Sequence, residues 1–215
     1  MDNLSSDSPL VVVVDNDDSF TGSLVQLFRM QGARIRWDRW DATDTGALGE
    51  ATLILLSPGP GAPAERPVNL AIARDPPAPV FGVCLGMQAI GEAWGARVGR
   101  APVPRHGRAS AVRHAGAGCF GGPEAPLPSP FRATRYHSLA VTELPACLEA
   151  TAWAPDGVLM GLRHRARPLE AVQFHPESVR THHGAQLARN VLAWAVSARA
   201  DLRVRPPQRS GPGSR

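Results

Sequence analysis

Short apolar runs alternate with segments of helical periodicity in the first half of the chain. Residues 10–14 form a β-branched, almost unbroken run, which is typical of a parallel strand covered on both faces. The next segment can be capped by Asp18 or Ser19, has apolar residues at helical spacing and ends at Gly32. Further strands are expected at residues 33–37, 52–56 and 78–83, with a weak helix ending near residue 73 and another over residues 85–94. This alternation predicts an open α/β sheet.

The pattern changes after Gly95, where shorter strands are separated by loops rich in glycine and proline. These strands are expected at residues 97–100, 109–113, 148–154, 157–163 and 169–174, followed by a final helix over residues 184–198. We therefore expect a three-layer α/β/α fold with an open, mostly parallel sheet and a small antiparallel extension. The expected organisation is a flexible N-terminus over residues 1–9, one domain over residues 10–198 and a disordered arginine- and proline-rich tail over residues 199–215.

Composition excludes several classes of protein. The chain has 215 residues, of which 43% are hydrophobic and 20% charged, as in a globular protein. Its apolar runs are far shorter than the ~20 residues that span a bilayer, and its acidic, polar N-terminus is unlike a signal peptide. Three scattered cysteines are too few for a disulfide framework or a zinc site. We expect a reduced, cytoplasmic protein that does not associate with membranes.

The basic character of the chain is confined to its C-terminal end. The net charge is +4 and the pI about 9.7, and every one of the 23 Lys+Arg residues is an arginine. Five of these arginines and a single acid fall within residues 199–215, whereas the rest of the chain carries equal numbers of arginines and acids. A basic protein often binds nucleic acid, but this distribution leaves the body of the protein neutral. We expect no nucleic-acid partner.

A candidate nucleophile lies between an apolar strand and a helix. Cys84 is flanked by Gly82 and Gly86, and these glycines permit the tight, strained turn of a nucleophile elbow. At the helix N-terminus the dipole favours the thiolate, and the N–H of Leu85 is free to stabilise an oxyanion. A buried core cysteine is the alternative interpretation, and this segment alone leaves both open.

A candidate base follows a second apolar strand. His175 ends this strand, and Glu177 comes two residues later, after a proline that fixes the turn. The imidazole can take a proton from a thiol, and Glu177 can set its tautomer and stabilise the imidazolium. A strand-end histidine beside a solvated glutamate is the alternative. The presence of both fragments in one chain favours a Cys–His–Glu triad.

A rigid loop provides a third candidate element. Residues 57–61 read Ser-Pro-Gly-Pro-Gly and follow an inner apolar strand. The carboxyl edge of an open α/β sheet is where ligands bind and where the Cys84 elbow must also lie. Gly59 offers an N–H with no side chain in the way, which suits a second oxyanion donor. Most Pro/Gly clusters are simple turns, and that alternative stands for this segment alone.

The three motifs together carry a family resemblance. The combination of Gly-Val-Cys-Leu-Gly-Met-Gln, Phe-His-Pro-Glu-Ser and Ser-Pro-Gly-Pro-Gly resembles a class I (triad) glutamine amidotransferase over residues 10–198. Residues 15–21, 106–108 and 135–139 look like those of the glutaminase subunits (component II) of chorismate-aminating synthases. The resemblance implies a flavodoxin-like sheet and attack of Cys84 on the side-chain amide of L-glutamine. His175 would transfer the proton, Glu177 would orient it, and Gly59 and Leu85 would supply the oxyanion N–H groups.

The resemblance also implies a substrate site and a partner. The positions that match glutamine-binding residues of the family are Gly59, Pro60, Gly61, Gln88, Ser138 and Leu139. The ammonia would pass to a separate synthase subunit (component I) that aminates chorismate to 4-amino-4-deoxychorismate or to anthranilate. That subunit would carry its own Mg²⁺, so that this chain is expected to hold neither cofactor nor metal. Residues 144–153 and 160–164 look more like subunits of the folate path, which makes 4-amino-4-deoxychorismate.

Some positions depart from the family pattern. Met87 stands where these subunits usually have histidine, Arg108 replaces the usual lysine, and residues 22–23 replace an aromatic–Asn pair. None of these positions belongs to the triad, although residues 22–23 bear on contacts with the partner. Two other functions remain open: a stand-alone γ-glutamyl hydrolase that uses the same triad, and a non-catalytic binding subunit.

The remaining polar candidates are expected to be inert. They comprise Cys119, Cys147 and the pair His182–His183, which enters the last helix. The tryptophans Trp94, Trp153 and Trp194 are expected in the core, and residues 135–137 are expected to face the synthase or to form an ordinary loop.

Overall fold

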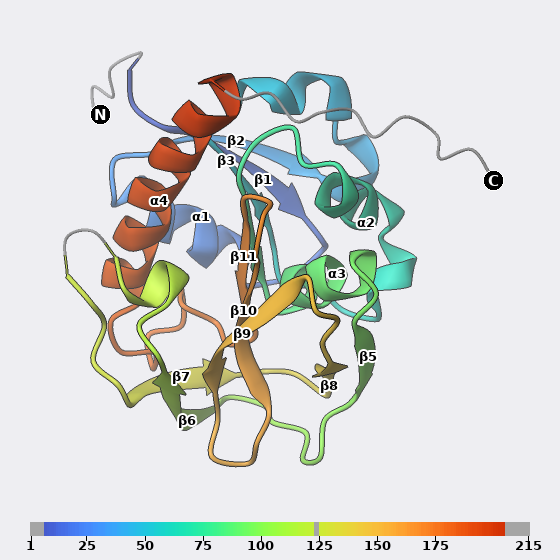
Figure 1. Cartoon of the computed structure of the whole chain (residues 1–215), viewed down its shortest axis with the longest axis vertical. Helices are drawn as coiled ribbons and strands as arrows, with labels where there is room; N and C mark the ends of the chain where they lie inside the picture. Colours follow the sequence, from blue (N-terminus) through green and yellow to red (C-terminus); the bar gives the residue numbers. More distant parts are fainter. Residues whose placement is uncertain (1–6, 123–124, 205–215) are drawn as a thin grey trace.

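Nine strands form one mixed sheet in the computed structural model, which describes residues 7–122 and 125–204 (Figure 1). The strand order is β2-β1-β3-β4-β11-β10-β9-β6-β7; the five strands from β2 to β11 run parallel, and the remaining four continue the sheet in antiparallel fashion. A separate antiparallel pair consists of β5 and β8. The strands are β1 Leu10–Asp15, β2 Arg34–Arg39, β3 Leu53–Leu56, β4 Val80–Val83, β5 Arg97–Arg100, β6 Arg108–His114, β7 Phe131–Arg135, β8 Leu139–Glu143, β9 Leu148–Trp153, β10 Leu159–His164 and β11 Leu169–Val172.

Helices cover both faces of the parallel part of the sheet (Figure 1). The α-helices are α1 Thr21–Arg29, α2 Pro67–Arg74, α3 Leu85–Ala93 and α4 Gly184–Val204, and the short 3₁₀ turns are η1 Trp40–Ala42, η2 Thr45–Glu50, η3 Pro63–Glu65 and η4 Gly118–Phe120. Val11 and Val13 of β1 pack toward α1 and α4, whereas Val12 and Val14 pack toward α2 and α3. Because successive strand residues point to opposite faces, the unbroken apolar run produces two cores. The three-layer α/β/α fold predicted from the sequence is confirmed.

The parallel arrangement brings the predicted motifs to one edge of the sheet. β4 lies between β3 and β11, and all three strands run in the same direction. The residues that follow them are therefore adjacent: the loop over residues 57–61 after β3, Cys84 after β4, and His175 shortly after β11. This is the carboxyl edge at which open α/β sheets bind their ligands.

The C-terminal helix is longer than expected. It continues past residue 198 to Val204, and the Arg199 side chain donates hydrogen bonds to the carbonyls of Gly49 and Pro77. The expectation of a disordered tail was wrong for residues 199–204, since an ordered turn of helix carries them; residues 205–215 lie outside the described part of the chain. At the other end, residues 1–6 of the expected flexible N-terminus are also outside it, and the carbonyls of Ser8 and Pro9 accept bonds from Arg34.

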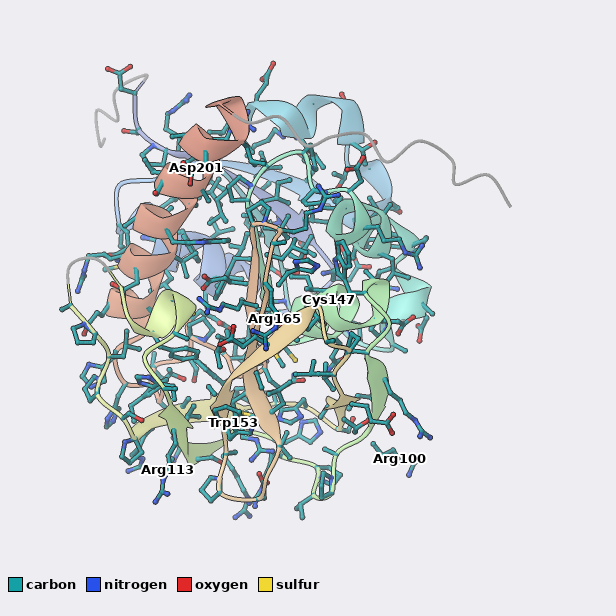
Figure 2. All side chains as sticks on the ribbon, in the orientation of Figure 1. Arg100, Arg113, Cys147, Trp153, Arg165 and Asp201 are labelled. Carbon is teal, nitrogen blue, oxygen red and sulfur yellow. The ribbon has the colours of Figure 1, made fainter. Side chains whose placement is uncertain are left out.

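Several local expectations differ from the structure for identifiable reasons. Neither Asp18 nor Ser19 is the N-cap of α1; Phe20 holds that position, and the Asp18 carboxylate accepts the Phe20 N–H. Strands β7 and β8 were not expected, because each is only five residues long and no apolar stretch in them exceeds three residues. Trp153 ends β9 (Figure 2). It is 40% exposed and does not belong to the core. Trp94 and Trp194 are half-buried and pack against the two cores.

Glu170 is a buried acid in β11, on the face of the sheet covered by α4. Its carboxylate accepts the Cys119 N–H at 2.6 Å, and the side chain is close to Gly118. Burial raises the pKa of Glu170 from 4.5 to about 7, although the contact with Cys119 and the charge of Arg163 act in the opposite direction. Burial, assisted by Glu170, also raises the pKa of the Cys119 thiol well above its usual value, which agrees with an unreactive cysteine.

The raised pKa of Glu170 makes the stability of the fold dependent on pH. The folded chain keeps this proton up to pH 7, whereas the unfolded chain loses it near pH 4.5, so the free energy of unfolding should decrease by about 3 kcal/mol between these values. Glu170→Gln should remove that decrease in urea-unfolding measurements from pH 4.5 to 8. The control is Glu143→Gln, which removes an acid whose side chain is 70% exposed and should keep the wild-type profile. A Glu170→Gln profile parallel to that of the wild type would contradict this assignment.

Candidate active site

The turn at Cys84 is strained in the way that a nucleophile elbow requires. Cys84 has φ 53° and ψ −102°, a conformation that non-glycine residues rarely adopt, and its side chain is buried. The backbone of α3 passes so close to the sheet that a Cβ at Gly86 would lie 2.3 Å from the Leu56 carbonyl oxygen. A Cβ at Gly82 would lie 2.5 Å from the Gly86 backbone. Both glycines are therefore required by the packing of the elbow.

His175 is held in place from several sides. The backbone N–H of His175 donates to the Thr134 carbonyl at 2.9 Å. The backbone carbonyl of His175 accepts a hydrogen bond from the Thr181 hydroxyl at 2.6 Å. The rings of Phe20 and Tyr136 pack edge-on against the imidazole, with centroids 5.5 and 5.0 Å away. These contacts leave the ring little freedom to rotate.

The histidine and the glutamate form a buried pair. Nδ1 of His175 donates to Oε1 of Glu177 at 2.6 Å, and both side chains are almost completely buried. This bond places the proton on Nδ1 and leaves Nε2 for the neighbouring Cys84. Burial by itself lowers the pKa of His175, but the contacts with Cys84 and Glu177 outweigh it and raise the pKa to about 10. The imidazole is therefore poised to hold a proton taken from the thiol.

The two residues that the sequence suggests as oxyanion donors, Gly59 and Leu85, lie in contact. Leu85 opens α3, and N–H groups in the first turn of a helix have no partner within the helix. Gly59 packs directly against this residue: a Cβ at Gly59 would lie 2.7 Å from the Leu85 side chain and 2.6 Å from the Asn16 Cβ. Only glycine allows the loop to approach so closely. The structure therefore brings the two predicted donors together.

A buried amide network that the motifs did not identify supports this loop. The Asn16 N–H donates to the Ser57 hydroxyl, and the Asn16 side-chain NH₂ donates to the Ser57 carbonyl, both at 2.9 Å. Asn69 donates to the Asn16 side-chain oxygen at 2.7 Å. The signal in the sequence was an asparagine at the end of a buried strand. The network fixes the loop that carries Gly59.

The predicted substrate-binding residues surround the same edge. A cavity of about 730 Å³ is lined by residues that include Gly61, Ser138 and Leu139. Pro60 and Ser138 are exposed, whereas Gln88 is buried and donates to the Leu139 carbonyl at 3.1 Å. The buried amide of Gln88 is thus joined by a hydrogen bond to a residue that lines this cavity.

Other candidates lie elsewhere or differ from expectation. Cys147 precedes β9, at the opposite end of that strand from Trp153 (Figure 2). Among the described residues, no group of three or more His, Cys, Asp or Glu side chains is arranged to hold a metal ion. Arg135 and His137 are buried, so the expectation that they face a partner was wrong for these two residues; only Tyr136 between them is half-exposed.

The comparisons with known proteins agree with this geometry. The family model for class I glutamine amidotransferases matches residues 12–194. The chain belongs to the class I glutamine amidotransferase family. The amidotransferase also resembles a solved structure of a Thermoplasma acidophilum protein described as part of a GMP synthase, with a TM-score of 0.82 and 26% identity over 93% of this chain and 100% of that one. In the described residues of the amidotransferase, no helix is long and apolar enough to cross a membrane.

Relatives of the amidotransferase carry two kinds of name. It is 54% identical over 186 residues to aminodeoxychorismate synthase of Streptomyces griseus, covering 83% of this chain but only 25% of that protein. It is 47% identical to anthranilate synthase component 2 of Thermus thermophilus, covering 85% of this chain and 91% of the relative. It is 46% identical to aminodeoxychorismate synthase component 2 of Serratia marcescens, in an alignment that covers 85% of this chain and 99% of the relative. The chain thus spans about a quarter of the first relative and nearly all of the other two.

Proposed function

We propose that this chain is the glutaminase subunit of a chorismate-aminating synthase and that Cys84, His175 and Glu177 hydrolyse L-glutamine. The observation that carries the proposal is the strained Cys84 elbow beside the buried His175–Glu177 pair. A thiol, a base and an orienting carboxylate at one ligand-binding edge are the requirements for covalent acyl transfer. Names of relatives that include component 2 subunits support the assignment to a two-subunit synthase.

The first half of the reaction releases ammonia. His175 takes the thiol proton, and the sulfur of Cys84 attacks the side-chain carbonyl carbon of glutamine. The N–H groups of Gly59 and Leu85 stabilise the oxygen that becomes negative in the tetrahedral intermediate. The carbon–nitrogen bond then breaks as His175 gives its proton to the departing nitrogen. Ammonia and a γ-glutamyl thioester on Cys84 result.

The second half restores the enzyme. His175 removes a proton from a water molecule, whose oxygen attacks the thioester carbonyl through the same oxyanion contacts. The carbon–sulfur bond breaks, glutamate leaves, and the proton returns to the sulfur. Glu177 stabilises the imidazolium in both halves through its 2.6 Å bond to Nδ1.

The ammonia is proposed to pass to a separate component I subunit, which binds chorismate and supplies its own Mg²⁺. We favour 4-amino-4-deoxychorismate as the product, because residues 144–153 and 160–164 resemble folate-path subunits. These residues contribute the adjacent strands β9 and β10. Anthranilate, or use of this chain by both synthases, is the second candidate, and relatives of both names match along similar lengths.

Reconstitution with each candidate component I tests the proposal. The purified chain, glutamine and chorismate should yield 4-amino-4-deoxychorismate, with glutamine hydrolysis increasing when the partner is added. Formation of anthranilate alone would refute the folate assignment. Rapid glutamine hydrolysis without any partner would favour a γ-glutamyl hydrolase, and failure of a glutamine-mimicking electrophile to label Cys84 would favour a non-catalytic subunit.

A further inference from the structure

Gln173 is a buried amide to which the motifs assign no role. It follows β11, lies two residues before His175 and is completely buried. Its Nε2 is 3.5 Å from the sulfur of Cys84, and its Oε1 is 3.2 Å from Nε2 of Gln88. An amide in this place assists a thiolate only if its NH₂ group, and not its oxygen, faces the sulfur.

The orientation of this amide follows from one backbone carbonyl. The carbonyl of Leu139 can only accept hydrogen bonds, and Gln88 lies 3.1 Å from it, so Gln88 must present its NH₂ group there. The second N–H of that group is directed at Gln173, whose oxygen must then be the acceptor. The NH₂ group of Gln173 is consequently the end that faces Cys84.

His137 binds the same carbonyl with its own ring. Its Nδ1 donates to the Leu139 carbonyl at 2.9 Å, and its Nε2 accepts from Nε of Arg135 at 3.0 Å. Both bonds require a neutral imidazole with its proton on Nδ1. Burial and the charge of Arg135 lower the pKa of His137 to about 4, although the bond to Leu139 acts in the opposite direction, so this tautomer persists at neutral pH.

Arg135 is in turn anchored by a carboxylate near the surface. The guanidinium is fully buried and donates to both oxygens of Asp156, at 3.0 and 2.8 Å. Burial opposes ionisation of Asp156, but the bonds and charge of Arg135, with Arg105 nearby, outweigh it and lower the pKa of this acid. Asp156 therefore stays ionised at neutral pH. Hydrogen bonds run without interruption from Asp156 to the nucleophile.

We propose that Gln173 is a catalytic residue whose amide N–H stabilises the Cys84 thiolate, and that Asp156, Arg135 and His137 position the Leu139 carbonyl that orients it. The proposal rests on the glutaminase function proposed above and adds residues to its site. The same carbonyl belongs to the segment that lines the substrate cavity. Substitution of Asp156, Arg135 or His137 should therefore affect mainly glutamine binding. Substitution of Gln173 should affect the reactivity of the Cys84 sulfur.

Gln173→Glu tests the inner end of this arrangement. The substitution keeps the oxygen that Gln88 needs and replaces the N–H that faces the sulfur. Alkylation of Cys84 by iodoacetamide, followed on the full chain at pH 7.5 by peptide mass spectrometry, should slow about tenfold or more, since a hydrogen bond to a charged group is lost. Gln173→Met, which is uncharged and also lacks the N–H, should slow it similarly. Folded variants of both kinds that react at the wild-type rate would overturn the role of Gln173.

Asp156→Asn tests the outer end. It should raise the KM for glutamine and slow labelling by 6-diazo-5-oxo-L-norleucine more than it lowers kcat or the iodoacetamide rate. The matched control is Glu143→Gln, an exposed acid in β8 that pairs with Arg97 at 3.4 Å and should behave as wild type. Equal fold-changes in KM, kcat, the rate of labelling by the glutamine analogue and the iodoacetamide rate would overturn the positioning role. If the wild-type chain fails to react with the glutamine analogue, the glutaminase function is refuted, whereas the iodoacetamide rates still decide the role of Gln173.

Discussion

Cys84→Ala is expected to lower glutamine hydrolysis by about 10⁴-fold or more in the reconstituted complex. The substitution removes the atom that forms the thioester, and no other described cysteine lies beside His175. Because Cys84 is small and buried, alanine leaves the surrounding packing almost unchanged. Release of glutamate and ammonia, measured at saturating glutamine, gives the loss in kcat, and mass spectrometry shows whether any γ-glutamyl adduct forms.

The matched control for this variant is Cys147→Ala. Cys147 is half-buried ahead of β9, and its thiol lies 3.9 Å from the Trp94 carbonyl. This variant should keep wild-type turnover, and 6-diazo-5-oxo-L-norleucine should still label it at Cys84. A Cys84→Ala protein that retains glutaminase activity would exclude the triad mechanism. It would favour the alternative in which this site is non-catalytic.

Gly86→Ala is expected to destabilise the fold by about 3 kcal/mol or more. The added methyl group would lie 2.3 Å from the Leu56 carbonyl oxygen and 2.8 Å from the Leu56 Cβ. A backbone carbonyl in a central strand cannot move aside, so α3 must shift away from β3. The shift would also displace the elbow, so activity should fall together with the midpoint of thermal or urea unfolding.

Gly49→Ala is the control for this substitution. A Cβ at Gly49 would have no described atom within 4 Å, and the residue has no positive φ. This variant should match the wild type or gain up to about 1 kcal/mol, because alanine restricts the unfolded chain. A Gly86→Ala protein as stable as the Gly49→Ala protein would contradict this prediction. It would show that α3 can lie farther from the sheet without loss of stability.

That Cys84 and His175 lie at one edge of the sheet could be predicted from the strands that precede them. Each of Cys84 and His175 follows an apolar run, and parallel strands place their carboxyl ends at a common edge. The flanking glycines indicated the elbow, and the spacing of His175 and Glu177 indicated their pairing. The helix boundary at residue 198 was less predictable, since the last turn of α4 depends on Arg199 reaching the carbonyls of Gly49 and Pro77.

The supporting residues could not be found in the same way. Asn16 and Asn69 are 53 positions apart, and Gln88 and Gln173 are 85 apart, yet each pair shares a buried hydrogen bond. Nothing in the local sequence around an asparagine or glutamine specifies a partner so distant. Arg135 and His137 likewise looked like exposed loop residues, because a short strand that buries charge has no apolar pattern.

The sequence by itself determined the alternation of strands and helices and the neutral body with its basic end, features that follow from periodicity and composition. Together with the family resemblance, its motifs also named Cys84, His175 and Glu177 as the candidate nucleophile, base and orienting acid. Only the tertiary structure decided which amides face Cys84, which histidine stays neutral and which acid keeps its proton. Those properties depend on burial and on hydrogen bonds between segments far apart along the chain, and folding alone creates both.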